Sequence, residues 1–337
     1  MQEQSASRGW NGVRHEGRGR GHVESYFLKL NDPGGSRALW LKATILERRG
    51  RGALPVAEAW AIAFDRGGRH VAAKETVALR EACFSRERLG VRVAELALEE
   101  GRARGSVTGS ALTGSSSRID FDLAFTTAAP ALVPFPSPRM YEGPLPSSKL
   151  VSPHPDSRFE GSYSVDGERV RVEGWHGMQG HNWGTRHAEL YAWCHCNQWE
   201  GDEDLVLEGV TARVKVGPLL APPLTVLCVR HRGVRHDMNA PLELLRARGR
   251  IGARRWTFSA ESSLARVSGE VWAETPDFVG LAYENPGGET TYCLNSKIAR
   301  ARVRLSVAGR PAKDVITRAA ALEIGTKDPE HGVAMLA

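Results

Sequence analysis

Short extended segments follow one another along almost the whole chain, and turn residues separate them. In the first half we expect strands over residues 25–30, 37–47, 57–65, 71–79, 91–99, 102–109 and 119–126. The breaks between them are rich in Gly, Asn, Asp and Pro, as in Asn31-Asp-Pro-Gly-Gly35, and these residues favour tight turns. About eight strands at roughly ten-residue spacing are typical of an antiparallel sandwich or barrel.

The same pattern resumes at Gly161 and continues to Val307. There we expect strands over residues 168–173, 190–199, 205–216, 224–231, 242–250, 254–260, 265–274, 280–284 and 290–307. Helical periodicity is scarce, and residues 81–89 and 315–322 are the two short candidates. The sequence therefore predicts an all-β protein with two antiparallel β domains in tandem and few short helices.

Composition suggests where these domains begin and end. Residues 1–21 are rich in Gly, Arg and Ser without periodicity, which predicts a flexible N-terminal arm. Residues 128–155 contain eight prolines, and proline cannot donate to a strand ladder, so we expect a semi-rigid linker there. The expected domains are an N-terminal barrel over residues 22–127 and a C-terminal barrel over residues 156–337.

The overall composition excludes several classes of protein. Hydrophobic residues make up 41% and charged residues 25%, as in globular proteins. No run reaches the roughly 18 apolar residues of a membrane-spanning helix, and the N-terminus lacks the apolar core of a signal peptide. The five cysteines are an odd, unevenly spaced set, which favours a reducing compartment over a disulfide framework. We expect a cytoplasmic protein.

Basic residues slightly outnumber acidic ones, 45 against 39, and 37 of the basic residues are arginine. The arginines are spread over both halves, and no basic helix or zinc-finger spacing accompanies them, so we expect no nucleic-acid partner. Weak attraction to an anionic membrane surface, as a peripheral contact, fits this charge better. The oligomeric state does not follow from the sequence.

Residues 174–199 contain four of the nine tryptophans and four of the eleven histidines. The second half of this segment alternates with period two, so successive side chains of a strand would point to opposite faces. One face carries ordinary core residues: Leu190, Ala192, Cys194 and Cys196. The other face carries large aromatic and polar residues: Tyr191, Trp193, His195, Asn197 and Trp199. An aromatic wall with a few polar groups is typical of a small-molecule cavity, so we predict that these five line one.

The His and Cys residues of this segment do not have the spacing of a metal site. Cys194 and Cys196 would share one face of the strand with His195 on the other, and no second ligand pair follows. The chain has no Gly-X-Ser-X-Gly elbow for a nucleophile, and its Gly-rich turns lack the helix that would present amides to a phosphate. We therefore expect no metal and no nucleotide or other cofactor.

Two glycines bracket an imidazole, an amide and an indole in Gly180-His-Asn-Trp-Gly184. Glycine at such positions indicates positive φ or close backbone approach. Two interpretations remain open from the residues alone. The segment is either a tight turn capped by Asn182, with Trp183 closing the end of a barrel, or part of the wall of a pocket.

This motif, followed by Tyr191-Ala-Trp-Cys-His-Cys-Asn197, resembles the carotenoid 1,2-hydratase family. It is also similar to the wider group of two-lipocalin-domain proteins, which includes tocopherol cyclase and the fungal Diels–Alderases of decalin biosynthesis. Glu24-Ser-Tyr-Phe27 and Ala38-Leu-Trp-Leu-Lys42 are similar to the start of bacterial members. The resemblance implies two lipocalin-like antiparallel β-barrels packed together, with a hydrophobic ligand between or inside them. It also implies hydration, cyclisation or isomerisation of an isoprenoid or polyene substrate without a cofactor.

The resemblance transfers roles to some residues only. It implies that His181 donates or relays a proton and that Trp183 stabilises positive charge. The family's Asp before that histidine is Gly180 here, and its downstream Tyr-X-Asp pair has no clear equivalent. Protonation of an alkene needs an acid in a dry pocket, and burial raises the pKa of a carboxyl group.

Glu208 fits the role of this acid if its side chain faces the cavity, and the alternative is a carboxylate on the outer face of a barrel. Further expected wall residues are Trp40, Trp60 and Tyr283, after which Glu284 is another acid. The departures from the family's motif leave a second function open, a lipid-binding or carrier protein of the same fold that performs no chemistry.

Overall fold

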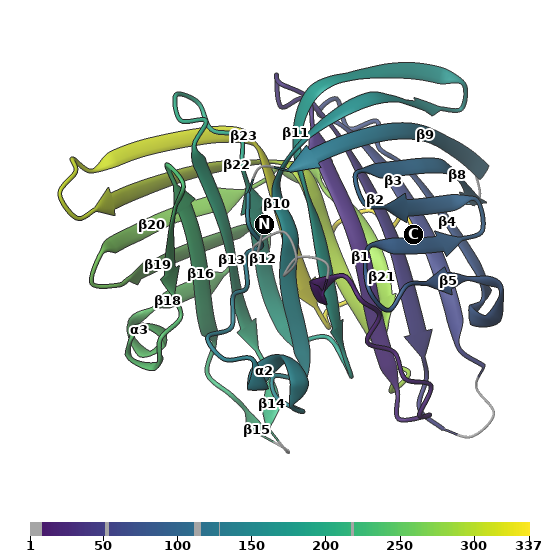
Figure 1. The fold of residues 1–337 in the computed structure, drawn as a ribbon, viewed down its shortest axis with the longest axis horizontal. Coiled ribbons are helices and arrows are strands. Elements are labelled where there is room, and N and C mark those ends of the chain that lie inside the picture. The colour runs from purple at the N-terminus through teal and green to yellow at the C-terminus, as the bar shows by residue number, and fades with distance from the viewer. Residues whose placement is uncertain (1–8, 51–53, 111–115, 128, 217–218) are drawn as a thin grey trace.

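The computed structural model describes residues 9–50, 54–110, 116–127, 129–216 and 219–337. They form two large antiparallel sheets, each curled into a half-barrel, and the half-barrels lie side by side (Figure 1). The helices of the described residues are short, as in α2 (Arg139–Glu142) and α3 (Pro241–Arg246). The predicted all-β fold of two lipocalin-like units is confirmed. None of the helices in the described part of the chain has the length and apolar character needed to cross a bilayer.

The first sheet has eleven strands in the order β4-β3-β2-β1-β11-β10-β9-β8-β7-β6-β5. Its curl brings the end strand β4 against β8 and β9. Its strands are β1 (His22–Asn31), β2 (Arg37–Glu47), β3 (Val56–Asp65), β4 (Val71–Ala78), β5 (Cys83–Phe84), β6 (Gly90–Val93), β7 (Leu96–Glu99), β8 (Arg102–Ser110), β9 (Ser116–Thr127), β10 (Ser148–Val165) and β11 (Glu168–Gly184).

The second sheet has ten strands in the order β17-β16-β13-β12-β23-β22-β20-β19-β18, and β21 pairs with one end of β22. A separate two-stranded pair joins β14 (Lys215–Val216) and β15 (Leu219–Leu220). The strands of the large sheet are β12 (Leu190–Cys196), β13 (Leu205–Arg213), β16 (Leu224–His231), β17 (Val234–Met238), β18 (Arg248–Ile251), β19 (Arg255–Glu261), β20 (Ala265–Trp272), β21 (Val279–Glu284), β22 (Thr290–Val307) and β23 (Lys313–Thr326).

The two sheets do not divide the chain at the expected boundary between residues 155 and 156. The long hairpin of β10 and β11 belongs to the first sheet, because β11 pairs with β1 along nine residues and β10 pairs with β9. The chain passes to the second sheet between Gly184 and Leu190. The Pro-rich segment accordingly ends inside the first sheet, where Leu132 forms an isolated bridge with Ser152 of β10.

Both expected helices are absent from the described structure at their predicted positions. Residues 315–322 lie within strand β23, and a run of buried alanines at 319–321 gave that strand its helical periodicity. Residues 79–81 form a single 3-10 turn, followed by the short strand β5. Conversely, a helix occupies the first part of the segment 242–250, which we expected to be a strand. This helix, α3, has Pro241 at its first position, where proline is favoured.

Apolar side chains form three large clusters, one inside each half-barrel and one between the two sheets. Strands β1, β2 and β3 are buried on both faces, because alternate residues contribute to the core of the first half-barrel and to the cluster between the sheets. We call the third cluster, with the polar groups beside it, the inter-sheet layer. Its largest members are Phe27, Trp40, Trp60, Phe64, Met178, Tyr191, Trp193, Leu281 and Tyr283.

Residues 9–21, expected to belong to a flexible arm, pack on the first half-barrel in their first part. The side chain of Asn11 is buried and exchanges hydrogen bonds with Gln179 of β11, at 2.9 and 3.2 Å. The amide of Val13 donates to the carbonyl of Ser85 at 2.9 Å. These are contacts of single residues without a repeating pattern, so periodicity could not reveal them.

Candidate functional site

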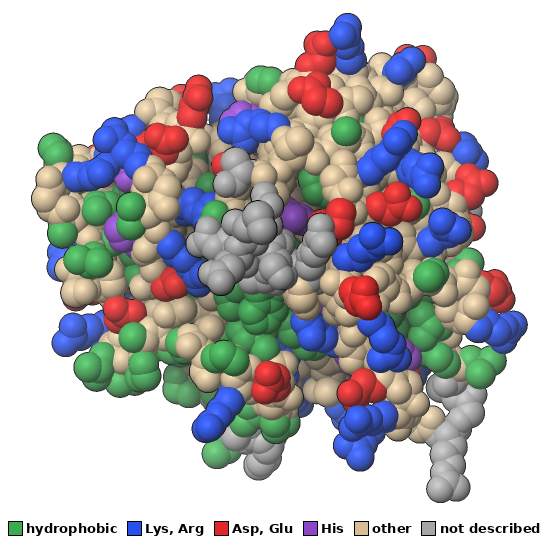
Figure 2. All heavy atoms as spheres, in the orientation of Figure 1, with side chains coloured by type: hydrophobic (Ala, Val, Ile, Leu, Met, Phe, Trp, Pro, Cys, Tyr) green, Lys and Arg blue, Asp and Glu red, His purple; other side chains and the backbone are tan. Residues whose placement is uncertain are grey.

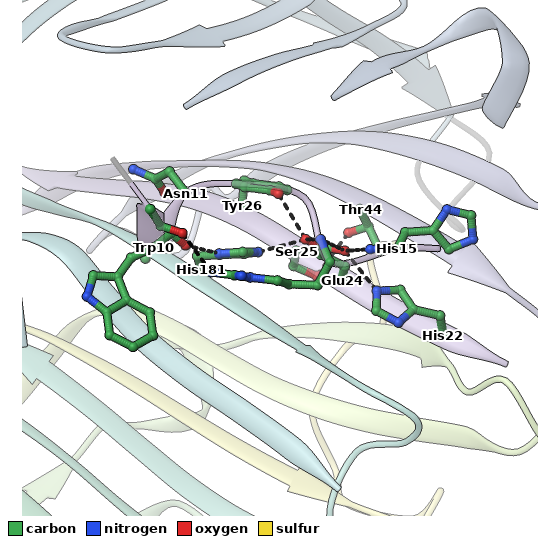
Figure 3. Close-up of polar contacts among 12 residues, drawn as sticks. Trp10, Asn11, His15, His22, Glu24, Ser25, Tyr26, Thr44 and His181 are labelled. Carbon is green, nitrogen blue, oxygen red and sulfur yellow. Dashed lines mark hydrogen bonds and ion pairs between the residues drawn. The ribbon is translucent and has the colours of Figure 1, made fainter. Parts of the chain in front are cut away.

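His181 lies on the concave face of the first sheet, and strand pairing fixes its position. It stands directly opposite Tyr26 of β1, so the two side chains point to the same face. The imidazole stacks on the Tyr26 ring with a centroid distance of 4.2 Å and lies 4.8 Å from the Trp183 ring. Figure 3 shows this stack and the polar group around it.

Glu24, two residues before Tyr26, is the centre of this polar group (Figure 3). Its buried carboxylate accepts hydrogen bonds from the Tyr26 hydroxyl (2.9 Å), His181 Nε2 (2.9 Å) and His22 Nε2 (2.8 Å). The backbone amides of Arg14 and His15 donate to it as well, at 2.8 and 2.9 Å. Burial alone would raise the pKa of Glu24, but the hydrogen bonds and charges of His181 and His22 outweigh it and hold that pKa well below its usual value.

The two hydrogen-bond partners of the His181 ring define its role. Nδ1 lies 2.6 Å from the carbonyl oxygen of Trp10, which can only accept, so Nδ1 carries a hydrogen. Nε2 lies 2.9 Å from Glu24 Oε1, so each ring nitrogen lies beside an oxygen acceptor. Both side chains are fully buried. His181 therefore holds the N-terminal segment against β1 and β11, and its geometry matches a positioning role better than the expected proton transfer to a substrate.

The Gly180–Gly184 segment is the end of strand β11, so the expected tight turn is not formed. Gly180 does not have positive φ, and its side of the strand faces the inter-sheet layer. A Cβ atom at this position would overlap the ring of Phe27. Close packing on Phe27 thus explains why this chain has no room for the carboxylate that the resemblance leads one to expect there.

The expected wall residues do come together, but away from His181. Tyr191, Trp193, Trp40, Trp60 and Tyr283 all lie in the inter-sheet layer. Strand β11 separates them from His181 and Trp183, whose side chains point to the opposite face of the first sheet. The predicted catalytic pair and the predicted aromatic wall therefore do not form one site.

The other three residues of the predicted wall, His195, Asn197 and Trp199, lie in three different surroundings. His195 faces the layer, and its Nε2 donates to the carbonyl of Pro155 at 2.8 Å, while burial lowers its pKa well below the usual value and keeps the ring neutral. Asn197 lies beyond the end of β12 and donates to Asp156 Oδ1 and to the carbonyl of Gly177. Trp199 packs in the core of the second half-barrel, because the strand alternation ends at Cys196.

The prediction that these five residues line an enclosed hollow is not met by the pockets that the structure shows. A pocket of about 330 Å3 lies at the Pro-rich segment, and one of about 190 Å3 lies near Pro311. Neither is lined by a residue of the 191–199 segment. Trp193 and His195 instead pack against neighbouring side chains, with 5% and 0% exposure.

The larger pocket has a size at the lower end of the range for small-molecule sites. The N-terminal segment, the Pro-rich segment with α2, and β17 each contribute to its wall. Tyr141 belongs to α2, and apolar side chains gather beside that helix on the face shown in Figure 2. The lining residues are Trp10, Val133, Phe135, Pro136, Pro138, Tyr141, Arg235, Asp237 and Asn239.

Glu208 is a buried acid behind this pocket. Its Oε1 accepts hydrogen bonds from Ser152 Oγ (2.9 Å) and Trp193 Nε1 (3.0 Å), while Oε2 has no partner among the described residues. Burial raises the pKa of Glu208 to about 7, and those two hydrogen bonds reduce the shift only in part. The side chain is on the outer face of the second half-barrel, which is the alternative that the sequence left open for Glu208. Strand β10 covers that face and keeps water away.

A row of directly opposed residues connects Glu208 to the pocket. His195, Glu208, Cys228 and Asp237 are successive cross-strand partners on β12, β13, β16 and β17, so all four share one face. Asp237 lines the pocket, and adjacent strands are about 4.8 Å apart, which places Glu208 about 10 Å from Asp237 along the sheet. Leu132 packs on Cys228 between them.

Sequence reasoning missed the lysines of the inter-sheet layer. Lys29, Lys42 and Lys297 are buried, with 0%, 5% and 0% exposure. Lys297 pairs with Glu323 at 2.6 Å, and burial lowers the pKa of Lys29 and of Lys42 to about 8. Lys29 follows Phe27 by two residues, and Lys42 follows Trp40 by two residues. This period-two spacing would have indicated that each lysine shares a strand face with a buried aromatic residue. Among the described residues, no group of three His, Cys, Asp or Glu side chains could hold a metal ion.

Comparison with known proteins shows the fold and no family. No protein-family model matches the chain. The uncharacterised protein Rv0493c of Mycobacterium tuberculosis is 28% identical over 301 residues, which are 86% of this chain and 82% of that protein.

Among solved structures, CghA is similar with a TM-score of 0.56 and 13% identity, over 93% of this chain and 90% of CghA. A candidate AttH from Nitrosomonas europaea has a TM-score of 0.53 and 13% identity, over 89% of this chain and 92% of that protein. The resemblance expected from the sequence is thereby confirmed at the level of the fold.

Proposed function

We propose that this protein is an enzyme that protonates a carbon–carbon double bond of an apolar small molecule, with Glu208 as the acid. The observation that carries the proposal is the state of this side chain. It is a buried carboxyl group with a pKa raised to about 7 and one oxygen without a partner. A pKa near the working pH keeps part of the carboxyl groups protonated and is the range in which general acids are most effective.

A pocket whose wall at Asp237 is about 10 Å from Glu208 along the sheet supports the same chemistry, and Cys228 and Leu132 lie between the two. The pocket of about 330 Å3 has aromatic walls, and aromatic faces stabilise the positive charge that forms when an alkene is protonated. The fold also accommodates a bound compound in a related structure, since CghA has been determined together with Sch210972. The aromatic and proline side chains of this lining favour an isoprenoid or polyene, and Arg235, Asp237 and Asn239 would face a polar end of the same molecule.

The reaction needs only the transfer of a proton. The Glu208 O–H bond breaks, a C–H bond forms at one alkene carbon, and the other carbon becomes cationic. Addition of water then gives hydration, attack by a second double bond gives cyclisation, and loss of a neighbouring proton gives isomerisation. In each case a proton leaves the product and returns to the Glu208 carboxylate, so no electron acceptor or donor is required.

Product formation from a panel of isoprenoid and linear polyenes, in normal and deuterated water, tests this proposal. We expect the wild type to incorporate one deuterium at the protonated carbon and to lose activity as pH rises above about 7. Glu208→Gln keeps the shape of the side chain and should reduce kcat by about 10²–10⁴-fold. Substrate affinity should change less than about threefold, because the glutamine fills the same volume.

Glu58→Gln is the matched control, since it removes a largely buried carboxylate whose partners are Lys74 and Trp60 rather than Ser152 and Trp193. This variant should retain the wild-type rate. Unchanged turnover in Glu208→Gln would remove the carboxyl group from the mechanism. Binding of polyenes without conversion by the wild type would favour the carrier function instead.

A further inference from the structure

Three hydrogen-bond donors in the inter-sheet layer lack an acceptor. Trp40 Nε1 and the Tyr283 hydroxyl have no oxygen or nitrogen partner among the described residues, and both side chains are more than nine-tenths buried. The hydroxyl lies beside the thiol of Cys293. The ammonium group of Lys42 makes no hydrogen bond or ion pair with any described residue. Buried polar groups normally have partners, so two buried unpartnered donors beside an ammonium group without an acceptor indicate a ligand.

Aromatic rings surround the ammonium group of Lys42. Its nitrogen lies 3.8 Å from the centroid of the Tyr283 ring, 5.5 Å from that of Trp40 and 5.7 Å from that of Trp60. Cation–π attraction of this kind compensates only part of the hydration that a buried ammonium group loses. Lys42 is opposite Phe27 and Trp60 in the strand register, so the backbone keeps it in this place.

The charges of the layer do not balance around this group. Glu323 is occupied by Lys297 (2.6 Å) and by Asn295 (3.1 Å). Glu58 is occupied by Lys74 (2.8 Å) and by Trp60 Nε1 (3.2 Å). Lys74 and Lys297 therefore have carboxylate partners, and Lys29 donates to Asn31 Oδ1 and to the carbonyl of Ala319. Among these four lysines, Lys42 is the one whose ammonium group has neither a carboxylate nor a hydrogen-bond acceptor among the described residues.

We propose that Lys42, Trp40 and Tyr283 bind the carboxylate of a lipophilic acid. A carboxylate has two oxygens with about four acceptor positions, so it can take hydrogen bonds from all three donors and supply the missing negative charge. Apolar side chains of the same cluster, among them Phe27, Ile62 and Leu281, surround these donors, and the hydrocarbon part would enter by moving them apart, since both pockets lie elsewhere. Glu208 is not a member of this site, since its hydrogen-bond partners are Ser152 and Trp193.

The ligand can approach from the edge of the layer. Tyr191, His187 and Lys74 are partly exposed there, whereas the residues deeper in the layer are buried. The imidazole of His187 stacks on the Tyr283 ring at 5.4 Å, and its Nδ1 contacts Asn285 Oδ1 at 3.0 Å. His187 is therefore in place to cover a carboxylate bound next to Tyr283.

Isothermal titration calorimetry of the full chain with decanoate tests the inference, and decanol, decanamide and acetate are the comparison ligands. We expect decanoate to bind at least tenfold more tightly than the two neutral decyl compounds. Acetate should bind weakly, because it lacks the hydrocarbon part. Decanol binding as tightly as decanoate would overturn the inference, and acetate binding as tightly would reduce the site to one for small anions.

Lys42→Met should lower the affinity for decanoate at least tenfold, and Trp40→Phe should lower it by a smaller factor. The matched control is Lys74→Met, because Lys74 also contacts the Trp60 ring (4.2 Å) but already has Glu58 as its partner. This control should change the affinity less than about threefold. Glu208→Gln should also bind decanoate like the wild type, so failure of the site and failure of the proposed reaction are distinguishable.

Thermal unfolding without ligand gives an independent readout. A lysine kept only for structure would be stabilising, whereas a ligand-binding ammonium group without a counter-ion costs stability in the unliganded protein. Lys42→Met should therefore raise Tm by about 2–4 °C at pH 7. A lower Tm together with unchanged decanoate affinity would assign Lys42 a structural role and refute the site.

Discussion

At the scale of single residues, burial decides the chemistry of Glu208. Glu208 and Glu24 are both buried glutamates, yet their pKa values shift in opposite directions. Two imidazoles and two backbone amides stabilise the charge on Glu24, whereas Glu208 has only a hydroxyl and an indole N–H. The protonated form is consequently favoured at Glu208 and the ionised form at Glu24.

Glu208→Gln should change the pH dependence of stability in a defined direction. Because the folded pKa of about 7 exceeds the unfolded value of 4.5, the folded protein holds the proton more tightly, and wild-type stability falls as pH rises from about 4.5 to 7. Above pH 7 the variant should be more stable than the wild type by up to about 3 kcal/mol. Urea unfolding at pH 5 and pH 8 measures this, and an equal difference at both values would contradict it.

At the scale of elements, the hydrogen-bonded pair of His181 and Glu24 joins three segments. Glu24 is on β1, His181 is on β11, and both bind the backbone of residues 10–15. Arg14 adds a cation–π contact with Trp183 at 5.1 Å. The Trp183 ring also lies 5.9 Å from Tyr141, which connects this group to the wall of the larger pocket. The expected catalytic pair thus supports the pocket from behind.

Glu24→Gln should release the N-terminal segment. The substitution takes the charged acceptor away from His181, His22 and Tyr26, and each buried donor that loses its acceptor costs about 1–3 kcal/mol. Hydrogen exchange of the amides of residues 13–15 should accelerate more than that of the strands. The lowered pKa of Glu24 also means that wild-type stability falls as pH drops below about 4.5, a loss that the variant should not show.

Glu16→Gln is the control for this prediction, because Glu16 is in the same segment and its ion pair with Arg18 is exposed. It should alter the free energy of unfolding by less than about 0.5 kcal/mol. Equal effects of the two substitutions would show that the buried pair does not hold the segment.

At the scale of the whole molecule, the inter-sheet layer unites the two half-barrels. Strands β1, β2 and β3 contribute to it from the first sheet, and β12, β21 and β22 contribute from the second. Each half-barrel buries its outer face on the other, and neither outer face would be covered alone. We therefore expect the two sheets to unfold together.

Leu281→Ala tests this expectation from the second sheet. The fully buried leucine contacts the layer, and its truncation should reduce the free energy of unfolding by about 2–5 kcal/mol. Circular dichroism and tryptophan fluorescence should report one shared transition in wild type and variant. Leu264→Ala is the control, since that leucine is 59% exposed and should have little effect. Two separate transitions in the wild type would contradict the prediction.

The sequence by itself determined the class of fold and many of the strands. Residues 37–47, 224–231 and 290–307 are strands with the bounds that the alternation predicts, and the turns between them have the expected residues. These features are local, because alternation and turn chemistry depend on neighbours in the chain. The inward face of β12, with Ala192, Cys194 and Cys196, followed from the same local rule.

Only the tertiary structure decided which residues share a site. Strand β11 places His181 on one face of the first sheet and Met178 on the other, so a motif contiguous in sequence serves two separate regions. The pairing of β11 with β1 assigned the hairpin to the first sheet, and long-range pairing leaves no local trace in the sequence. The environments of Glu208 and Lys42 likewise come from strands far apart in the chain. Their altered pKa values result from burial by those strands, and burial is a property of the packed molecule rather than of the neighbouring residues.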